Sequence, residues 1–320
     1  MTFVFAFLTP FIIVLSLTPL FSKLAFKLDF TDKPTERKKH SAPVPLLGGL
    51  VMFIGFGAGF IFFAEFNSRM LFILSGCLLL TAIGMFDDYQ KTRGREFPVL
   101  PRLLAHVAAA VLAFAADIRF TGFFNPFSDR YIVFPVWLQF ITTVLWIMGL
   151  VNVINWMDGL DGLAGGLCTL SAFTLFVVAL VKQQSDSALT ALLLIGALLG
   201  FLRYNLPPPR MYMGDSGAYL LGYLLAVISL FGAFKQATVI SVFVPVLAMG
   251  VPIFDSLFVV FHRMRARKPV YEADSSNTAH IHFRLLGKGM KPAHAVGFIC
   301  LISACLNLTS IIILLISNAR

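Results

Sequence analysis

The 320-residue sequence has few charged side chains and few cysteines. Only 13% of its residues are charged, whereas soluble domains carry roughly 25%. Such a low charge content excludes an ordinary soluble enzyme and a disordered chain. The four cysteines include no CxxC pair and are too few to form the framework of a disulfide-rich module.

Hydrophobic side chains take the place of the missing charge. They make up 58% of the chain, with 34 Phe against three Trp and seven Tyr, and the mean hydropathy is +0.85. A helix needs about 20 apolar residues to cross a bilayer. Ten stretches approach that length, and we expect one all-α domain over 1–320 whose spans are 3–21, 46–64, 70–86, 103–118, 137–154, 163–181, 187–202, 217–234, 237–261 and 293–316.

Two details of these spans carry their own expectations. The ninth contains Pro245, Gly250 and Pro252, which predict a kink or a partly re-entrant half. All four cysteines fall within apolar stretches, so we interpret them as small core residues.

The distribution of charge predicts the orientation in the membrane. Loops 22–45, 87–102, 155–162, 203–216 and 262–292 hold 19 of the 25 Lys and Arg residues. The positive-inside rule places these loops in the cytoplasm and both termini outside, so the net charge of +9 indicates topology and lipid contact, not nucleic acid. Twelve of the sixteen acidic residues lie on or beside the same loops. This clustering predicts an active-site cleft on the cytoplasmic face, whereas a transporter would place ionisable groups within its spans.

The third span ends in Asp87-Asp88-Tyr89-Gln90-Lys91. Two carboxylates beside a cation suit Mg²⁺ binding or acid–base work on a phosphate. A simple polar cap that ends the span is the alternative.

A second motif, Asn-x-x-Asn-x-x-Asp-Gly-x-Asp-Gly-Leu-Ala, joins the fifth and sixth spans. Asn152, Asn155 and Asp158 follow each other at intervals of three, so they share one helix face. The glycines after Asp158 and Asp161 allow a tight turn and close approach to a ligand. Capping of the next helix would account for Asp161 alone.

A third segment runs from Asn205 through three prolines and Arg210 to Tyr212-Met-Gly-Asp215-Ser-Gly. The prolines predict a stiff extended stretch. Asp215 suits either a helix N-cap or a metal ligand, and Tyr212 suits stacking on a base.

The last cytoplasmic loop contains His280-Ile-His282-Phe-Arg284. Without Cys or a third close His, a zinc site is disfavoured, and we interpret these side chains as donors to a phosphate. We assign the basic runs 37–40 and 263–268 first to topology and lipid contact.

Carboxylates, amides, glycines and basic donors on these loops indicate Mg²⁺-dependent phosphoryl transfer. The membrane setting implies that one substrate is a lipid.

Taken together, the four motifs resemble those of the polyprenyl-phosphate N-acetylhexosamine-1-phosphate transferases, in the same order along the chain. The segment from Asp32 to Gly49 resembles the branch that uses UDP-GlcNAc. The resemblance implies a ten- or eleven-helix fold and Mg²⁺, with Mn²⁺ as an alternative metal. It also implies transfer of GlcNAc-1-phosphate from UDP-GlcNAc to undecaprenyl phosphate in a bacterial inner membrane, with UMP released, as the first membrane step of an envelope glycan.

The resemblance also implies roles for individual residues. Asp215 is the expected Mg²⁺ ligand, and Asp87 and Asp88 are expected near the lipid phosphate, with Asp158 completing the catalytic set. The expected substrate contacts are Asn152, Asn155, Asp161 and Asn205 with Tyr212 for the sugar nucleotide, Lys91 and Arg102 for phosphate, and His280, His282 and Arg284 for the donor.

Phe283 marks a departure from the family pattern, because members with small UDP-HexNAc donors commonly have HxHH there. This leaves a UDP-MurNAc-pentapeptide or another UDP-amino-sugar transferase as the alternative, although the run of three His in the MurNAc branch is missing. A membrane transporter is a more distant alternative. The expected partners are the two substrates and the bilayer, and a homodimer stays open.

Overall fold

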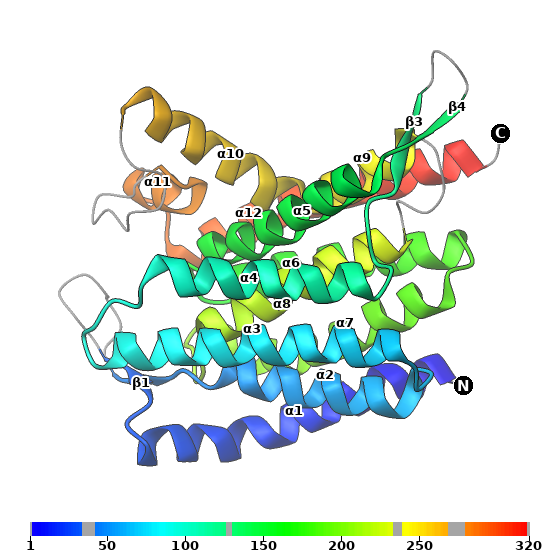
Figure 1. Cartoon of the computed structure of the whole chain (residues 1–320). Helices are drawn as coiled ribbons and strands as arrows, with labels where there is room; N and C mark the ends of the chain where they lie inside the picture. The colour runs from blue at the N-terminus through cyan, green and yellow to red at the C-terminus, as the bar shows by residue number, and fades with distance from the viewer. Residues whose placement is uncertain (1, 34–41, 126–129, 233–238, 268–278, 319–320) are drawn as a thin grey trace.

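The computed structural model describes residues 2–33, 42–125, 130–232, 239–267 and 279–318. Helices dominate these residues (Figure 1). The elements, in chain order, are α1 (Thr2–Lys27), β1 (Thr31–Asp32), β2 (Val44–Pro45), α2 (Gly48–Phe63), α3 (Ser68–Thr92), α4 (Val99–Ala115), β3 (Gly122–Asn125), β4 (Arg130–Val133), α5 (Val136–Met157), α6 (Leu163–Val181), α7 (Ser185–Asn205), α8 (Gly214–Gly232), α9 (Val239–Ala248), α10 (Gly250–Arg265), α11 (Ile281–Gly287) and α12 (Pro292–Asn318).

Every predicted apolar stretch overlaps a helix, although several helices extend beyond the predicted bounds. Seven helices in the described part of the chain are long and apolar enough to cross a membrane, while α2 and α4 are apolar but shorter, at 16 and 17 residues. The protein is therefore a polytopic membrane protein. Local signals set the helix ends: the Asn67 side chain caps α3 by accepting from the Met70 N–H at 2.9 Å, and α5 begins directly after Pro135.

The ninth apolar stretch is divided, as the prolines predict. α9 ends at Ala248 and α10 begins at Gly250. Pro252 has no N–H to donate to the carbonyl of Ala248. That carbonyl instead accepts from Ser171 Oγ of α6 at 2.7 Å and from Asn307 Nδ2 of α12 at 3.1 Å. Neighbouring helices thus supply the hydrogen bonds that the break in the helix removes, as polar backbone groups in an apolar setting require.

Two short strand pairs and one short helix were not predicted from the all-α pattern. β1 pairs antiparallel with β2, and β3 pairs antiparallel with β4. The seven-residue helix α11 lies in the last of the loops predicted to be cytoplasmic, between α10 and α12. Each is too short to produce a periodic pattern of apolar residues.

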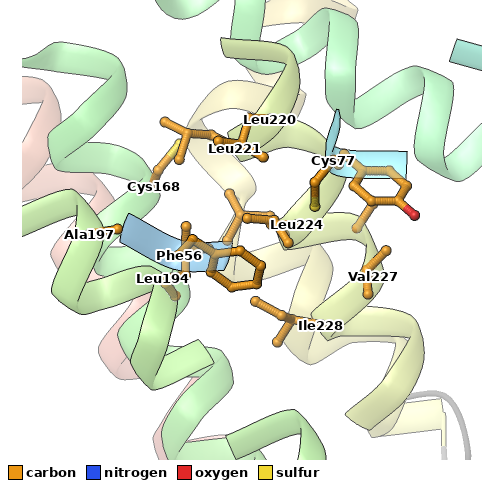
Figure 2. Close-up of a cluster of buried hydrophobic side chains, with 14 of the residues drawn as sticks. Phe56, Cys77, Cys168, Leu194, Ala197, Leu220, Leu221, Leu224, Val227 and Ile228 are labelled. Atoms are coloured by element: carbon orange, nitrogen blue, oxygen red, sulfur yellow. The ribbon is translucent and has the colours of Figure 1, made fainter. Parts of the chain in front are cut away.

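The hydrophobic core surrounds α8. Leu220, Leu221 and Leu224 of this helix belong to one buried cluster with Phe56 of α2 and Leu194 of α7 (Figure 2). The predicted core position of the cysteines holds for two of the four: Cys77 and Cys168 are buried in this cluster, whereas Cys300 is half-buried and Cys305 is exposed on α12. An outward-facing Cys305 fits a helix whose apolar face meets lipid.

The connections separate onto two ends of the bundle. Figure 1 shows both chain termini and the β3–β4 hairpin at one end, and β1, α11 and the α3–α4 connection at the other. The second end carries the predicted motifs, because α3 and α5 finish there and α8 begins there.

Candidate active site

The N-terminus of α8 is anchored by Asp88 at the end of α3. Asp88 Oδ1 accepts from the Asp215 N–H at 2.9 Å, and Oδ2 accepts from the Ser216 N–H at 3.2 Å. A carboxylate suits this place because the first N–H groups of a helix lack internal partners and carry partial positive charge. Asp88 is 2% exposed, and its contacts fix where Asp215 stands.

Asp215 is the hub of the site. Its Oδ1 accepts from Asn155 Nδ2 of α5 at 2.9 Å. Its Oδ2 contacts the Lys91 ammonium of α3 and lies 3.5 Å from the Tyr219 hydroxyl. The structure thus brings together Asn155, Lys91 and Asp215, which come from three motifs far apart in the sequence.

Asp87 lies beside Asp215 and is fully buried. Its Oδ2 is 3.2 Å from Arg102 Nη1 and 3.3 Å from the Tyr219 hydroxyl. Its Oδ1 is 3.5 Å from Lys91 Nζ but accepts no hydrogen bond from the described residues. Lys91 therefore bridges the two carboxylates, which would otherwise repel each other in a poorly solvated place.

Asp158 adds a fourth carboxylate, at the C-terminal end of α5. Burial, then the negative charges of Asp215 and Asp161, raises the pKa of Asp158 to about 7. A bound cation would favour its ionised form. Burial and the Asp161 carboxylate likewise raise the pKa of the Tyr212 hydroxyl, so Tyr212 and Asp161, two predicted contacts of the sugar nucleotide, lie together.

The two predicted amides beside the site have different surroundings. Asn205 joins two motif loops: its Oδ1 accepts from the Gly162 N–H at 3.0 Å, and its Nδ2 donates to the Met211 carbonyl at 3.1 Å. Asn152 donates to the Met148 carbonyl at 2.7 Å and faces His106 Nδ1 of α4 at 3.5 Å.

The His280–Arg284 segment packs against the loop after α5. The rings of His280 and His282 stack at 5.5 Å with 15° between their planes. The His282 ring is so close to Gly159 that a Cβ there would overlap its Nε2. Burial, then His280, lowers the pKa of His282 to about 4, which keeps this ring neutral. The guanidinium of Arg284 lies over the Phe258 ring of α10, 5.0 Å from the ring centroid.

Backbone hydrogen bonds hold the Tyr212–Asp215 loop from the other side. The Tyr212 N–H donates to the Pro45 carbonyl at 2.8 Å, and the Gly48 N–H donates back to the Tyr212 carbonyl at 3.1 Å. A Cβ on Gly49 would overlap the α8 backbone at Gly217, so this double glycine allows α2 to begin against α8.

Two residues of the site were not assigned from the sequence. Tyr219 contacts both Asp87 and Asp215, and its position four residues after Asp215 on a helix was an available signal. Asp255 forms a hydrogen bond with His280, and the sequence signal for it was an acidic residue inside an apolar stretch. The basic cluster 37–40 and Lys268 lie outside the described residues.

The polar groups of the site include ligands that a divalent cation could use. No group of three or more His, Cys, Asp or Glu side chains within the described ranges is already arranged around a metal position. Yet Asp87 Oδ1 is a buried acceptor without a hydrogen bond from these residues, and it shares the Lys91 ammonium with Asp215. Carboxylate oxygens are the ligands Mg²⁺ prefers, so this donor set fits the ion.

Comparison with known proteins identifies the class. Residues 70–233 match the family model described as glycosyl transferase family 4. The chain is 34% identical, over 97% of its length and 84% of the relative's, to a probable undecaprenyl-phosphate N-acetylglucosaminyl 1-phosphate transferase of Bacillus subtilis (strain 168). The protein belongs to glycosyl transferase family 4, which confirms the family that the motifs indicate.

Two further relatives mark the breadth of this family. The undecaprenyl-phosphate alpha-N-acetylglucosaminyl 1-phosphate transferase of Thermotoga maritima is 29% identical, over 87% of this chain and 81% of the relative. The phospho-N-acetylmuramoyl-pentapeptide-transferase of Listeria monocytogenes serotype 4b (strain CLIP80459) is 28% identical, over 72% of this chain and 74% of the relative.

Proposed function

We propose that this protein transfers GlcNAc-1-phosphate from UDP-GlcNAc to undecaprenyl phosphate, giving undecaprenyl-diphospho-GlcNAc and UMP. One observation carries the proposal: residues from three motifs meet in one cluster. Lys91 contacts the carboxylates of Asp87 and Asp215, and Asn155 donates to Asp215. The names of the Bacillus and Thermotoga relatives support the same reaction.

In the proposed reaction, an oxygen of the lipid phosphate attacks the β-phosphorus of the UDP-sugar. The bond from that phosphorus to the bridging oxygen breaks, and UMP leaves with the electron pair. Lys91 and Arg102 suit binding of the reacting phosphates, since charge-assisted hydrogen bonds to phosphate are strong. Asp87 is the carboxylate we place nearest the lipid phosphate, because both oxygens of Asp88 already accept from α8.

Asp215, with Asp87 beside it, would hold Mg²⁺ in this proposal. The ion, when bound, supplies positive charge that offsets the charge on the diphosphate. Lys91 currently contacts both carboxylates, so we expect this ammonium to turn toward phosphate when the ion and donor bind. Mn²⁺ is the expected substitute.

For the membrane, we propose ten spans, with α9 and α10 forming the ninth. An even number of spans agrees with both termini lying at one end of the bundle (Figure 1). The excess of Lys and Arg on the opposite end supports a cytoplasmic site in the bacterial inner membrane. The product would feed an envelope glycan of the O-antigen, common-antigen or teichoic-acid kind.

Tyr212→Ala is expected to raise the KM for UDP-GlcNAc about tenfold, since base–aromatic stacking contributes roughly 1–3 kcal/mol. Tyr212→Phe keeps the ring and is the matched control. Steady-state kinetics with each substrate varied in turn measures both constants. A normal donor KM combined with a raised KM for the lipid would contradict the uracil assignment.

Donor identity is tested by offering purified protein UDP-GlcNAc or UDP-MurNAc-pentapeptide with undecaprenyl phosphate. We expect lipid-linked GlcNAc, detected by mass spectrometry, and loss of product when EDTA removes the metal. Product from UDP-MurNAc-pentapeptide alone would favour the activity named for the Listeria relative. Phe283→His would then be the first substitution to examine.

A further inference from the structure

Asp255 is a buried acid that the proposed chemistry does not use. It lies on α10, just after the break in the ninth apolar stretch, and is 9% exposed. Its Oδ2 is 2.7 Å from His280 Nδ1, and its Oδ1 accepts from the Ile281 N–H at 2.7 Å. One carboxylate therefore fixes both the ring of His280 and the backbone that enters α11.

His280 continues this contact toward the candidate active site. Its ring stacks on that of His282, and its centroid lies 6.4 Å from that of the Trp156 ring. In the sequence, Trp156 lies between the site residues Asn155 and Asp158. His282 in turn presses on Gly159. A movement of the His280 ring would thus displace the Asn155–Asp161 loop, because the two are connected by packed side chains.

The bond to Asp255 also determines which nitrogen of His280 is free. A carboxylate next to one ring nitrogen keeps a proton there and leaves the other nitrogen to act. With Nδ1 held by Asp255, Nε2 is the nitrogen left for a substrate or a proton. Because a carboxylate accepts hydrogen bonds, this contact favours one ring orientation with the proton on Nδ1.

We infer that Asp255 is a positioning residue, which fixes the orientation and the Nδ1 proton of His280 and thereby sets the His280–His282 pair against the Asn155–Asp161 loop. The inference rests on the proposed function in one respect, namely that the His pair contacts the sugar-nucleotide donor. Asp255 itself touches no reacting group and acts through His280.

A double-mutant cycle on UMP release tests this coupling. Asp255→Asn retains the shape, but its one acceptor oxygen cannot serve both N–H groups. We expect the KM for UDP-GlcNAc to rise about tenfold or more, as for loss of a charged hydrogen bond, with a smaller change in kcat. In the His280→Ala background the same substitution should change KM less than about twofold. If the double variant shows the product of the two single KM increases, Asp255 and His280 act independently, and the inference is overturned.

Ser256→Ala is the matched control on α10. Ser256 is the next residue, is 3% exposed, and its hydroxyl has no hydrogen-bond partner among the described residues. We expect normal KM and kcat for this variant. A KM increase in Ser256→Ala equal to that of Asp255→Asn would mean that α10 packing alone matters, which would also overturn the inference.

A second measurement needs no substrate. Nitrogen-15 NMR of protein with labelled histidine rings reports which nitrogen carries the proton, and His280→Ala assigns the signal among the six His. We expect a protonated Nδ1 for His280 and a shifted signal in Asp255→Asn. If Asp255→Asn fails to fold, the wild-type spectrum decides: a proton on Nε2 alone contradicts the inference. Absence of UMP release from wild-type protein would refute the proposed function, while the spectrum still tests Asp255.

Discussion

Asp215→Asn is expected to lower the rate of UMP release by about 10²–10³-fold or more, the range for loss of one electrostatic catalytic group. The amide oxygen can still accept from Asn155, so the contact that joins α8 to α5 persists. What is lost is the negative charge that attracts Lys91 and, in our proposal, Mg²⁺. The measurement is steady-state kinetics over a range of Mg²⁺ concentrations, with the yield of membrane-inserted protein determined in parallel.

Asp117→Asn is the control for this substitution. Asp117 follows α4, is exposed, and pairs with Arg119 at 2.7 Å. Its left-handed backbone, with φ of 60°, suits Asn as well as Asp. We expect normal turnover. Near-normal activity of Asp215→Asn at saturating Mg²⁺ would contradict the role given to Asp215.

Gly214→Ala is expected to cause the largest loss of stability, about 2.5–5 kcal/mol. Gly214 has a φ of +66°, and a Cβ there would lie 2.8 Å from Cγ of Asp88 and overlap its carboxylate. The left-handed backbone costs about 1–2 kcal/mol with a side chain. Displacing Asp88 from the α8 N–H groups costs roughly another 1.5–3 kcal/mol. Activity should fall as well, because Asp215 moves with the start of α8.

Gly94→Ala separates the two contributions. Gly94 has a similar φ of +69°, but a Cβ there would meet nothing within 4 Å. It should therefore lose only the backbone part, about 1–2 kcal/mol, and keep its activity. Thermal unfolding of both variants in detergent gives the comparison. Equal losses of stability would mean that the Asp88 contact with α8 contributes nothing.

Much of the helical framework could be predicted from the sequence, because long apolar runs in a membrane protein dominate local preferences. The end of α3 could not. The predicted span stopped at 86, before the charged pair, yet the helix continues to Thr92. Asp88 stays helical because α8 supplies two N–H donors to it, a contact across 127 residues that no local pattern contains.

The candidate site could likewise be predicted only in part from the sequence. Asp87, Lys91, Asn155 and Asp215 were identifiable as polar groups without a topological reason, and the structure brings them into contact. Tyr219 and Asp255 were not assigned, because their sequence signals are weak on their own and their roles depend on partners from other segments. Asn205 was predicted as a substrate contact, and the structure gives it two loop-joining hydrogen bonds; the substrate contact stays a prediction.

Release of UMP from the purified protein in detergent is the decisive measurement for the proposed transferase. The complete reaction contains UDP-GlcNAc, Mg²⁺ and undecaprenyl phosphate, and each is omitted in turn. We expect release only when all three are present, and its loss in Asp215→Asn but not in Asp117→Asn. Release that continues without undecaprenyl phosphate would indicate hydrolysis of the donor. No release with this or any other UDP-amino sugar, from protein that is folded, would contradict the proposed transferase.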